Sequence, residues 1–218
     1  MTEILELNNI MAIIIAYLVG SVPSAIWVSK WFFGIDVRDY GSKNAGATNT
    51  FRVIGKKAGI PVLFFDILKG WASVKGLSYL FSVYEIGSDP YINLELAIGM
   101  AAVFGHVFPI YEGFKGGKGV ATLLGIILAI NLPAAAVCFG IFILIFVITN
   151  YVSLGAITAA FFFPFITIYI FKALSLSLIY FSIVISLLVI LTHRKNIYRL
   201  LKKEESKMPL NLHIKNRS

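Results

Sequence analysis

The feature that most constrains the fold is a series of apolar runs, each near the length needed to cross a membrane. A helix of roughly 20 apolar residues spans a hydrocarbon core about 30 Å thick. The runs lie at approximately residues 8–29, 60–81, 91–110, 119–131, 133–150, 153–171 and 174–192. The hydrophobic fraction of 58% is above that of a soluble domain. We therefore expect an all-α fold, a polytopic membrane helix bundle with about seven transmembrane helices in one domain over residues 1–218.

The fourth run is short, and the distribution of basic residues decides whether it is counted separately. Of the 19 lysines and arginines, six lie in 30–57, two in 111–118 and eight after His193. Seven helices with the N-terminus outside place all three basic segments on one side, which the positive-inside rule assigns to the cytoplasm. Merging 119–131 with the next run would separate them, and Pro133 also favours a break. We therefore keep the two runs apart, with 193–218 as a cytoplasmic tail.

Charge and cysteine content exclude other classes of protein. In so apolar a chain, the net charge of +8 indicates cytoplasmic loops rather than nucleic-acid binding. Glu3 and Glu6 stand where a signal peptide would carry positive charge, so we expect a retained first span. Cys138 is the single cysteine and lies in an apolar run, which excludes an intramolecular disulfide and argues against a metal site.

The first polar loop, from Asp36 to Lys57, is rich in glycine, amide and hydroxyl residues. Gly41 and Ser42 predict a tight turn with exposed N–H groups, and Ser42 or Asn44 is expected to cap a helix that ends at Gly55. On that helix Asn44, Thr48 and Arg52 would share one face. Such a surface suits a phosphate dianion. The candidate residues are Gly41, Ser42, Asn44, Thr48, Asn49 and Arg52, whereas Lys56 and Lys57 are interpreted as solvated topology signals.

The second loop surrounds Lys118 with Gly116, Gly117 and Gly119. These glycines allow backbone to approach a ligand closely at the start of the following helix. The spacing is not that of a Walker A loop, so nucleotide binding has little support. Glu112 and Lys115 are expected to be solvated. His106, just before this loop, is equally compatible with a structural role and with a site role.

The third polar segment follows the last apolar run. His193 and Asn196 fall on one face of an amphipathic continuation, and histidine is not needed for a basic stop-transfer cluster. The polar chain from Lys202 onward is expected to fray. Inside the second run, Asp66 and Lys69 are spaced to form an ion pair that braces the first loop.

Taken together, the motifs resemble those of the bacterial acyl-phosphate:glycerol-3-phosphate acyltransferases (PlsY type). The matching segments are Gly20–Pro23, Asp36–Arg52, Asp66–Gly70, Gly105–Pro109, Phe114–Thr122 and His193–Leu200. The resemblance implies a seven-helix enzyme of the bacterial inner membrane with its active site on the cytoplasmic side. It would transfer a fatty acyl group from acyl phosphate to the 1-hydroxyl of sn-glycerol 3-phosphate. The product would be lysophosphatidic acid, an early intermediate of phospholipid synthesis.

By motif position, the family's site residues fall on Ser42, Arg52, Lys118, His193 and Asn196. The expected partners are the two substrates and the lipid bilayer, with no cofactor and no obligate protein partner. The family often has a glycine and a glutamate after its Arg-Leu, where this chain has Leu201 to Glu205. The chain lacks a His-x4-Asp pair, which favours direct attack on the acyl carbon with His193 or a substrate phosphate oxygen as proton acceptor.

Two other functions are considered on the residues alone. A phosphate or organophosphate transporter would also need basic groups among helices, but such sites usually lie near the midplane of internal repeats. Here the polar motifs cluster at one membrane boundary, and no repeat is visible. A non-catalytic scaffold would leave the amide-rich loop and the glycine–lysine loop without a purpose.

Overall fold

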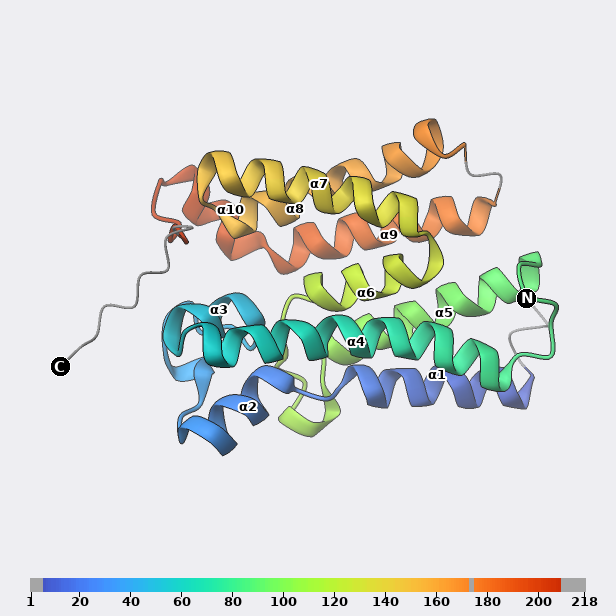
Figure 1. The fold of residues 1–218 in the computed structure, drawn as a ribbon, viewed down its shortest axis with the longest axis horizontal. Coiled ribbons are helices and arrows are strands. Elements are labelled where there is room, and N and C mark those ends of the chain that lie inside the picture. The colour runs from blue at the N-terminus through green and yellow to red at the C-terminus, as the bar shows by residue number, and fades with distance from the viewer. Residues whose placement is uncertain (1–5, 173–174, 209–218) are drawn as a thin grey trace.

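The computed structural model describes residues 6–172 and 175–208, and every regular element within them is helical. Figure 1 shows long helices packed side by side, joined by turns at two opposite ends. In chain order the elements are α1 (Leu7–Gly20), α2 (Ser24–Phe33), η2 (Val37–Asp39), α3 (Ala47–Val53), α4 (Lys56–Phe81), α5 (Asp89–Val107), η3 (Ile110–Glu112), α6 (Val120–Ile130), α7 (Leu132–Thr149), α8 (Val152–Phe165), η4 (Ile166–Ile170), α9 (Leu176–Thr192) and α10 (Arg194–Leu201).

Several stretches are long and apolar enough to cross a membrane. Within the described residues they are Leu7–Phe33, Asp89–Glu112, Leu132–Thr149 and Val152–Ile170, and the pair α9–α10, bent by 60°, makes a fifth if counted as one. Helix α4 is also long, with 26 residues, but it carries charged side chains. Helix α6 has 11 residues and reaches only about 16 Å. The predicted crossing of the bilayer by all seven segments stays a prediction.

Two expected helix boundaries differ from the structure. The first span is interrupted: α1 ends at Gly20, and α2 begins at Ser24 after Pro23. Proline lacks an N–H and restricts the residue before it, which explains the break. The last span was expected from residue 174, which lies outside the described residues; α9 begins at Leu176. Helices α6 and α7 are separate, as expected, with the break at Asn131 rather than at Pro133.

Small residues allow the helices to approach closely. Helix α4 packs mainly on α6, and α1 packs on α5, while α7, α8 and α9 form a second layer. A Cβ on Gly70 would collide with the Thr122 carbonyl, and one on Gly125 would collide with the Ile67 carbonyl, so glycine brings α4 and α6 together. Gly20 and Gly105 have the same effect between α1 and α5. Such small-residue crossings are typical of helix packing in lipid.

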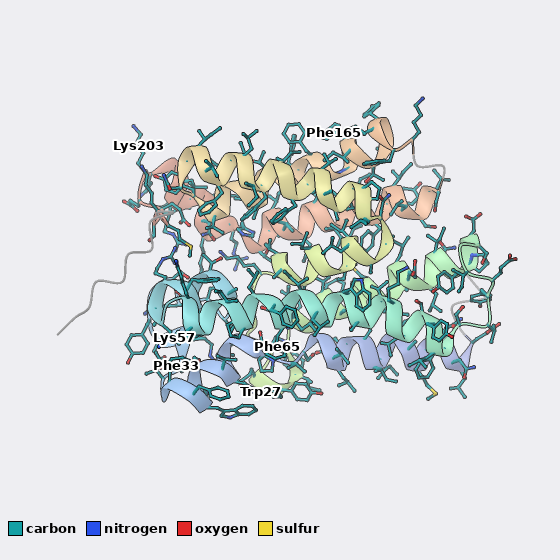
Figure 2. The ribbon with its side chains drawn as sticks, viewed as in Figure 1. Trp27, Phe33, Lys57, Phe65, Phe165 and Lys203 are labelled. Atoms are coloured by element: carbon teal, nitrogen blue, oxygen red, sulfur yellow. The ribbon has the colours of Figure 1, made fainter. Side chains whose placement is uncertain are left out.

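The surface and the two ends of the bundle differ in character. Large apolar side chains cover the outside, among them the exposed Phe33, Phe65 and Phe165, which are labelled in Figure 2. Helices α2, α3 and α10 and the α7–α8 turn gather at one end, shown on the left of Figure 1. The acidic α4–α5 connection lies at the opposite end. The fold thus brings the first loop and the region after α9 to the same end of the molecule.

Candidate active site

The corner between α9 and α10 holds a buried histidine in a defined tautomer. His193 is the cap residue between α9 and α10 and is 3% exposed. Its Nδ1 lies 2.8 Å from the carbonyl oxygen of Val189. Because a carbonyl only accepts hydrogen bonds, Nδ1 carries the proton and Nε2 keeps its lone pair. Burial and the nearby Lys118 ammonium lower the pKa of His193 to about 4, so the ring is neutral near pH 7.

Lys118 reaches this corner from the second loop. Its Nζ donates to Asn196 Oδ1 at 2.5 Å, which joins residues 78 positions apart in the sequence. Thr192 also lies against the carbonyl oxygen of Lys118, at 3.4 Å. Burial lowers the pKa of Lys118 from 10.5 to about 8; Glu205 opposes that shift, while Arg199 and Arg52 add to it. The structure therefore brings together Lys118, His193 and Asn196, as the sequence predicts.

Arg52 supplies a second cation. It lies on α3, half-buried, and its pKa is lowered by burial, with Glu205 opposing and Arg199 reinforcing the shift. It forms no hydrogen bond or ion pair with any residue that the structure describes. A partly dehydrated guanidinium without a carboxylate partner favours an added anion, since such groups bind phosphate with charge-assisted hydrogen bonds.

Glu205 anchors the cluster, and it is the member of the cluster that sequence reasoning missed. Its carboxylate accepts from Asn196 Nδ2 at 2.7 Å, Ser153 Oγ at 2.9 Å and Arg199 Nε at 2.7 Å, and its side chain is 6% exposed. Burial alone would raise its pKa, but these hydrogen bonds lower it below the ordinary value. One local signal was available, an acidic pair within a strongly basic tail.

The expectation of a frayed tail from Lys202 is wrong for the segment up to Met208. Met208 N donates to the carbonyl oxygen of Asn150 at 2.8 Å, in the α7–α8 turn. Together with the contacts of Glu205, this holds the chain against the end of the bundle. Residues 209–218 lie outside the described residues.

Lys203 stands in the left-handed region that favours glycine, with φ of 59°. We expect Lys203→Gly to stabilise the protein by about 1 kcal/mol, because a side chain in this conformation costs about that much. Thermal unfolding in detergent micelles measures the change. Lys202→Gly is the matched control: φ at Lys202 is −85°, so glycine there gains nothing and increases the entropy of the unfolded chain. An equal response of the two variants would contradict the explanation.

The first loop is organised by Asn49, and the structure corrects two expectations about it. Helix α3 begins at Ala47 after Gly46, so neither Ser42 nor Asn44 caps it, and Asn44 lies outside the helix. The Ser42 N–H is not exposed either, since it donates to Asn49 Oδ1 at 2.8 Å. The predicted cap is absent because the side chain of Asn49, from within α3, binds the backbone of the turn instead. Gly55 does follow the helix end, with φ of 101°.

Asn49 is 2% exposed and uses both ends of its amide on the loop. Its Nδ2 donates to the carbonyl oxygens of Val37 and Tyr40, at 2.8 and 3.1 Å. Gly41 has φ of 58°, and a Cβ there would lie 2.5 Å from Asn49 Oδ1. Both residues therefore shape the turn, rather than presenting free groups to a ligand. Within the described residues, no hydrogen bond joins Ser42, Asn44 or Thr48 to the cluster around Lys118, so their predicted contact with substrate stays a prediction.

The glycines before Lys118 also have a packing role. Gly116 N and Gly117 N donate to the carbonyl oxygens of Val107 and His106, both at 3.2 Å, so these N–H groups do not point to a ligand. A Cβ on Gly117 would collide with His106 Nε2. Gly119 has φ of 81° and sets the chain into α6. Substrate binding by Gly116, Gly117 and Gly119 stays a prediction, and the packing contacts explain these glycines without a ligand.

For Glu112 the structure contradicts the predicted role, and for His106 it narrows the two roles that the sequence left open. Glu112 is not solvated: its carboxylate lies 2.8 Å from Arg38 Nη2, and its side chain is 16% exposed. Arg38 also pairs with Asp36, and this hydrogen bond holds the pKa of Asp36 well below its ordinary value. Lys115 is exposed, as expected. His106 lies in a separate buried cluster with Asp66, outside the group formed by Lys118 and Asn196.

The assembled cluster is suited to anionic substrates. Two cations, Arg52 and Lys118, lie close enough to repel each other, and a neutral histidine with a free Nε2 lies beside Lys118. Cations in a water-poor site stabilise phosphate charge and developing oxyanions. A neutral imidazole accepts a proton from a hydroxyl. The arrangement fits group transfer between phosphate-bearing molecules.

Comparison with known proteins agrees with this chemistry. A family model described as glycerol-3-phosphate acyltransferase matches residues 10–203. The chain belongs to this family. The glycerol-3-phosphate acyltransferase of Fusobacterium nucleatum is 43% identical over 195 residues, covering 89% of this chain and 95% of that protein. The acyltransferase of Chlorobium phaeobacteroides strain DSM 266 is 39% identical over 233 residues, covering 95% and 99%.

Two crystal structures of PlsY (YgiH), an integral membrane glycerol 3-phosphate acyltransferase, resemble the whole fold. The glycerol 3-phosphate form has a TM-score of 0.82 and 36% identity, covering 92% of this chain and 96% of that chain. The lysophosphatidic acid form has a TM-score of 0.79 and 35% identity, covering 92% and 95%. The protein is therefore an integral membrane acyltransferase, and its helical fold matches that of PlsY over 92% of the chain.

Proposed function

We propose that this acyltransferase transfers a fatty acyl group from acyl phosphate to the 1-hydroxyl of sn-glycerol 3-phosphate, with lysophosphatidic acid and phosphate as products. The relatives' names and the two ligand forms of PlsY support the acceptor and the lipid product. The observation that carries the proposal is that two cations, Arg52 and Lys118, lie near each other at one end of the bundle, with a neutral His193 beside Lys118. Two phosphate-bearing substrates need those two cations, and family membership favours an enzyme over a transporter.

The reaction needs little covalent help from the protein. The hydroxyl oxygen of glycerol 3-phosphate attacks the acyl carbon, and the bond from that carbon to the bridging oxygen breaks. Phosphate leaves with the electron pair, and the hydroxyl proton goes to His193 Nε2 or to a substrate phosphate oxygen. Acyl phosphate already carries a good leaving group, so the main tasks are to position two anions and to stabilise the oxyanion. Arg52 and Lys118 serve both tasks.

The transfer proceeds without an acyl-enzyme in this proposal. His193 is the nucleophile candidate among the converging residues, but its Nε2 is needed next to the hydroxyl. Incubation with radiolabelled acyl phosphate alone, followed by acid quench and gel separation, tests the point. No label on the protein is expected. A labelled protein band that is discharged by glycerol 3-phosphate would establish the covalent route.

The site lies on the cytoplasmic side of the bacterial inner membrane, and all seven helical segments cross the bilayer. The support is that the first loop, Lys118 and the tail from His193 share one end of the bundle. Basic segments of this kind favour the cytoplasm. The acidic stretch between α4 and α5 lies at the other end. A lipid-soluble donor and a water-soluble acceptor would meet at that boundary.

The pKa of Lys118, about 8, predicts how activity changes with pH on the alkaline side. The charged ammonium is needed for phosphate, so kcat/KM for glycerol 3-phosphate should fall as the pH rises above about 8. The fall should approach tenfold per pH unit. Lys118→Arg should move it to higher pH at reduced activity, because a guanidinium keeps its charge. A wild-type profile flat to pH 10 would show that the charge of Lys118 is not required.

The donor is tested with purified protein in detergent micelles. Glycerol 3-phosphate is supplied with palmitoyl phosphate, palmitoyl-CoA or palmitoyl acyl carrier protein, and lysophosphatidic acid is quantified by mass spectrometry. We expect product with palmitoyl phosphate at a rate at least tenfold above the other donors. No product from palmitoyl phosphate, or equal rates with the thioesters, would overturn the proposed donor.

A further inference from the structure

A second group of buried polar side chains lies behind the Lys118 loop and takes no part in the proposed chemistry. Asp66, on α4, is 1% exposed. Its Oδ1 accepts from Ser24 Oγ at 2.7 Å and from Lys69 Nζ at 2.8 Å. His106 Nδ1, on α5, lies 3.5 Å from the same oxygen. Buried ionisable groups in a membrane protein are costly. A buried carboxylate with three polar partners therefore indicates a structural or functional role.

The group connects the helix break in the first span with the start of α6. Lys69 Nζ also donates to the carbonyl oxygen of Val22, at 2.8 Å, between α1 and α2. His106 Nδ1 lies 3.1 Å from Thr122 Oγ1, in the first turn of α6. Thr122 follows Lys118 by only four residues. The cluster therefore fixes the helix that leaves the Lys118 loop.

The same histidine fixes the backbone that enters the loop. The carbonyl oxygen of His106 accepts from Gly117 N at 3.2 Å. The ring stands against Gly117, because an added Cβ there would collide with His106 Nε2. A small cavity is lined by residues of the cluster and of both polar loops, among them Ala45, Gly116, Gly117, Asp66, Lys69 and His106. Contacts of His106 thus bracket Lys118 in sequence, at Gly117 and at Thr122.

We propose that His106, held by Asp66, is a positioning residue that places the Lys118 ammonium against Asn196 in the active site. It acts through the backbone and first turn on either side of Lys118, and it does not touch substrate. The proposal rests on the proposed function only in so far as Lys118 serves the transfer. A loosened loop would let the ammonium move toward water, away from Asn196, and reactions are sensitive to displacements of about 1 Å.

The test follows the environment of Lys118 without using substrate. Lysine acetylation with trace acetic anhydride, read by mass spectrometry at Lys118 over pH 6–11, reports the fraction of neutral amine. In the wild type the rate should rise near pH 8. In His106→Ala the rise should move to higher pH, because hydration restores the ordinary preference for the ammonium. The groups facing Lys118 are Asn196 and Arg199 on α10, His193, Arg52 on α3, and Glu205, and all remain in this variant.

Activity gives the second readout. We expect His106→Ala to lower kcat/KM by about 10²-fold. His106→Asn keeps a polar atom near the position of Nδ1 and should restore most of the loss. Thr122→Val removes only the hydroxyl contact with His106 and should lower kcat/KM several-fold. These two mild variants carry the test if His106→Ala does not fold.

Glu95→Gln is the matched control. Glu95 is a buried carboxylate on α5 whose Oε1 lies 2.8 Å from Lys75 Nζ on α4, so the pair joins the same two helices. It stands 11 residues from His106, roughly 16 Å along the helix. Glu95→Gln should lower the unfolding temperature without moving the Lys118 acetylation profile. An equal shift in this control would show general loosening and overturn the proposal.

Other outcomes are also decisive. A folded His106→Ala protein with the wild-type acetylation profile and kcat/KM within about threefold of wild type would overturn the positioning role. If wild-type protein made no lysophosphatidic acid, the proposed function would fail. The acetylation profile would still decide whether His106 positions Lys118.

Discussion

Replacing Lys118 with alanine should reduce kcat/KM for glycerol 3-phosphate by about 10²–10³-fold, comparable to the removal of a preorganised oxyanion donor. The change removes a cation that is largely buried and whose Nζ donates to Asn196 Oδ1. Arg52 would remain as the second cation of the site, but too little positive charge would be left for two phosphates. The loss should therefore appear in kcat as well as in KM. Steady-state kinetics in micelles measure both.

Lys115→Ala is the control for Lys118→Ala. Lys115 lies on the same loop, three residues earlier, and is exposed. An exposed lysine contributes mainly long-range charge, which salt screens, so kcat/KM should stay within about threefold of wild type. If the two variants lost activity equally, loop charge as a whole would explain the effect. A specific site at Lys118 would then be unsupported.

Glu205→Ala should have the second-largest effect, and it should lower stability and activity together. The carboxylate accepts three hydrogen bonds, from Asn196, Ser153 and Arg199, and its side chain is only 6% exposed. Removing an acceptor and leaving its donors unsatisfied costs about 1–3 kcal/mol. Asn196 would lose its anchor, and Arg199 would face Arg52 and Lys118 without a compensating negative charge.

Glu204→Ala provides the comparison, since Glu204 is the adjacent acidic residue and is exposed. We expect it to unfold at the wild-type temperature and to retain wild-type kcat/KM, whereas Glu205→Ala should unfold several degrees earlier and lose at least tenfold in kcat/KM. Unfolding is followed by intrinsic fluorescence in micelles. Indistinguishable behaviour of the two variants would mean that the tail does not support the site.

The apolar runs predicted the helices well because bilayer thickness and helix rise constrain length directly. A separate short α6 was predicted from the distribution of the basic segments and from Pro133, and the structure has the break at Asn131. The interruption of the first span was not predicted, although the sequence contains Pro23 at that point. In that case overall hydropathy was given more weight than the local effect of proline.

The sequence predicted the residues of the cluster that stand out locally, but not those whose role depends on distant partners. Lys118, His193 and Asn196 stand out locally, because a lysine among glycines and a histidine at a helix end have few structural explanations. The helix start near Ser42 was wrong because Asn49, seven residues on, takes the Ser42 N–H. The role of Glu205 depends on partners from α8 and α10, which no local pattern reveals. The glycines before Lys118 were interpreted as ligand contacts, but the ring of His106 occupies the space beside Gly117.

The most direct test of the account is the binding of glycerol 3-phosphate itself, measured by isothermal titration of purified protein in micelles without acyl donor. The account predicts saturable binding to wild type and to Lys115→Ala. It predicts at least a tenfold weaker affinity for Arg52→Ala and for Lys118→Ala, since each loses a charge-assisted phosphate contact of about 2 kcal/mol. Wild-type affinity in both Arg52→Ala and Lys118→Ala would contradict the assignment of this cluster as the acceptor site.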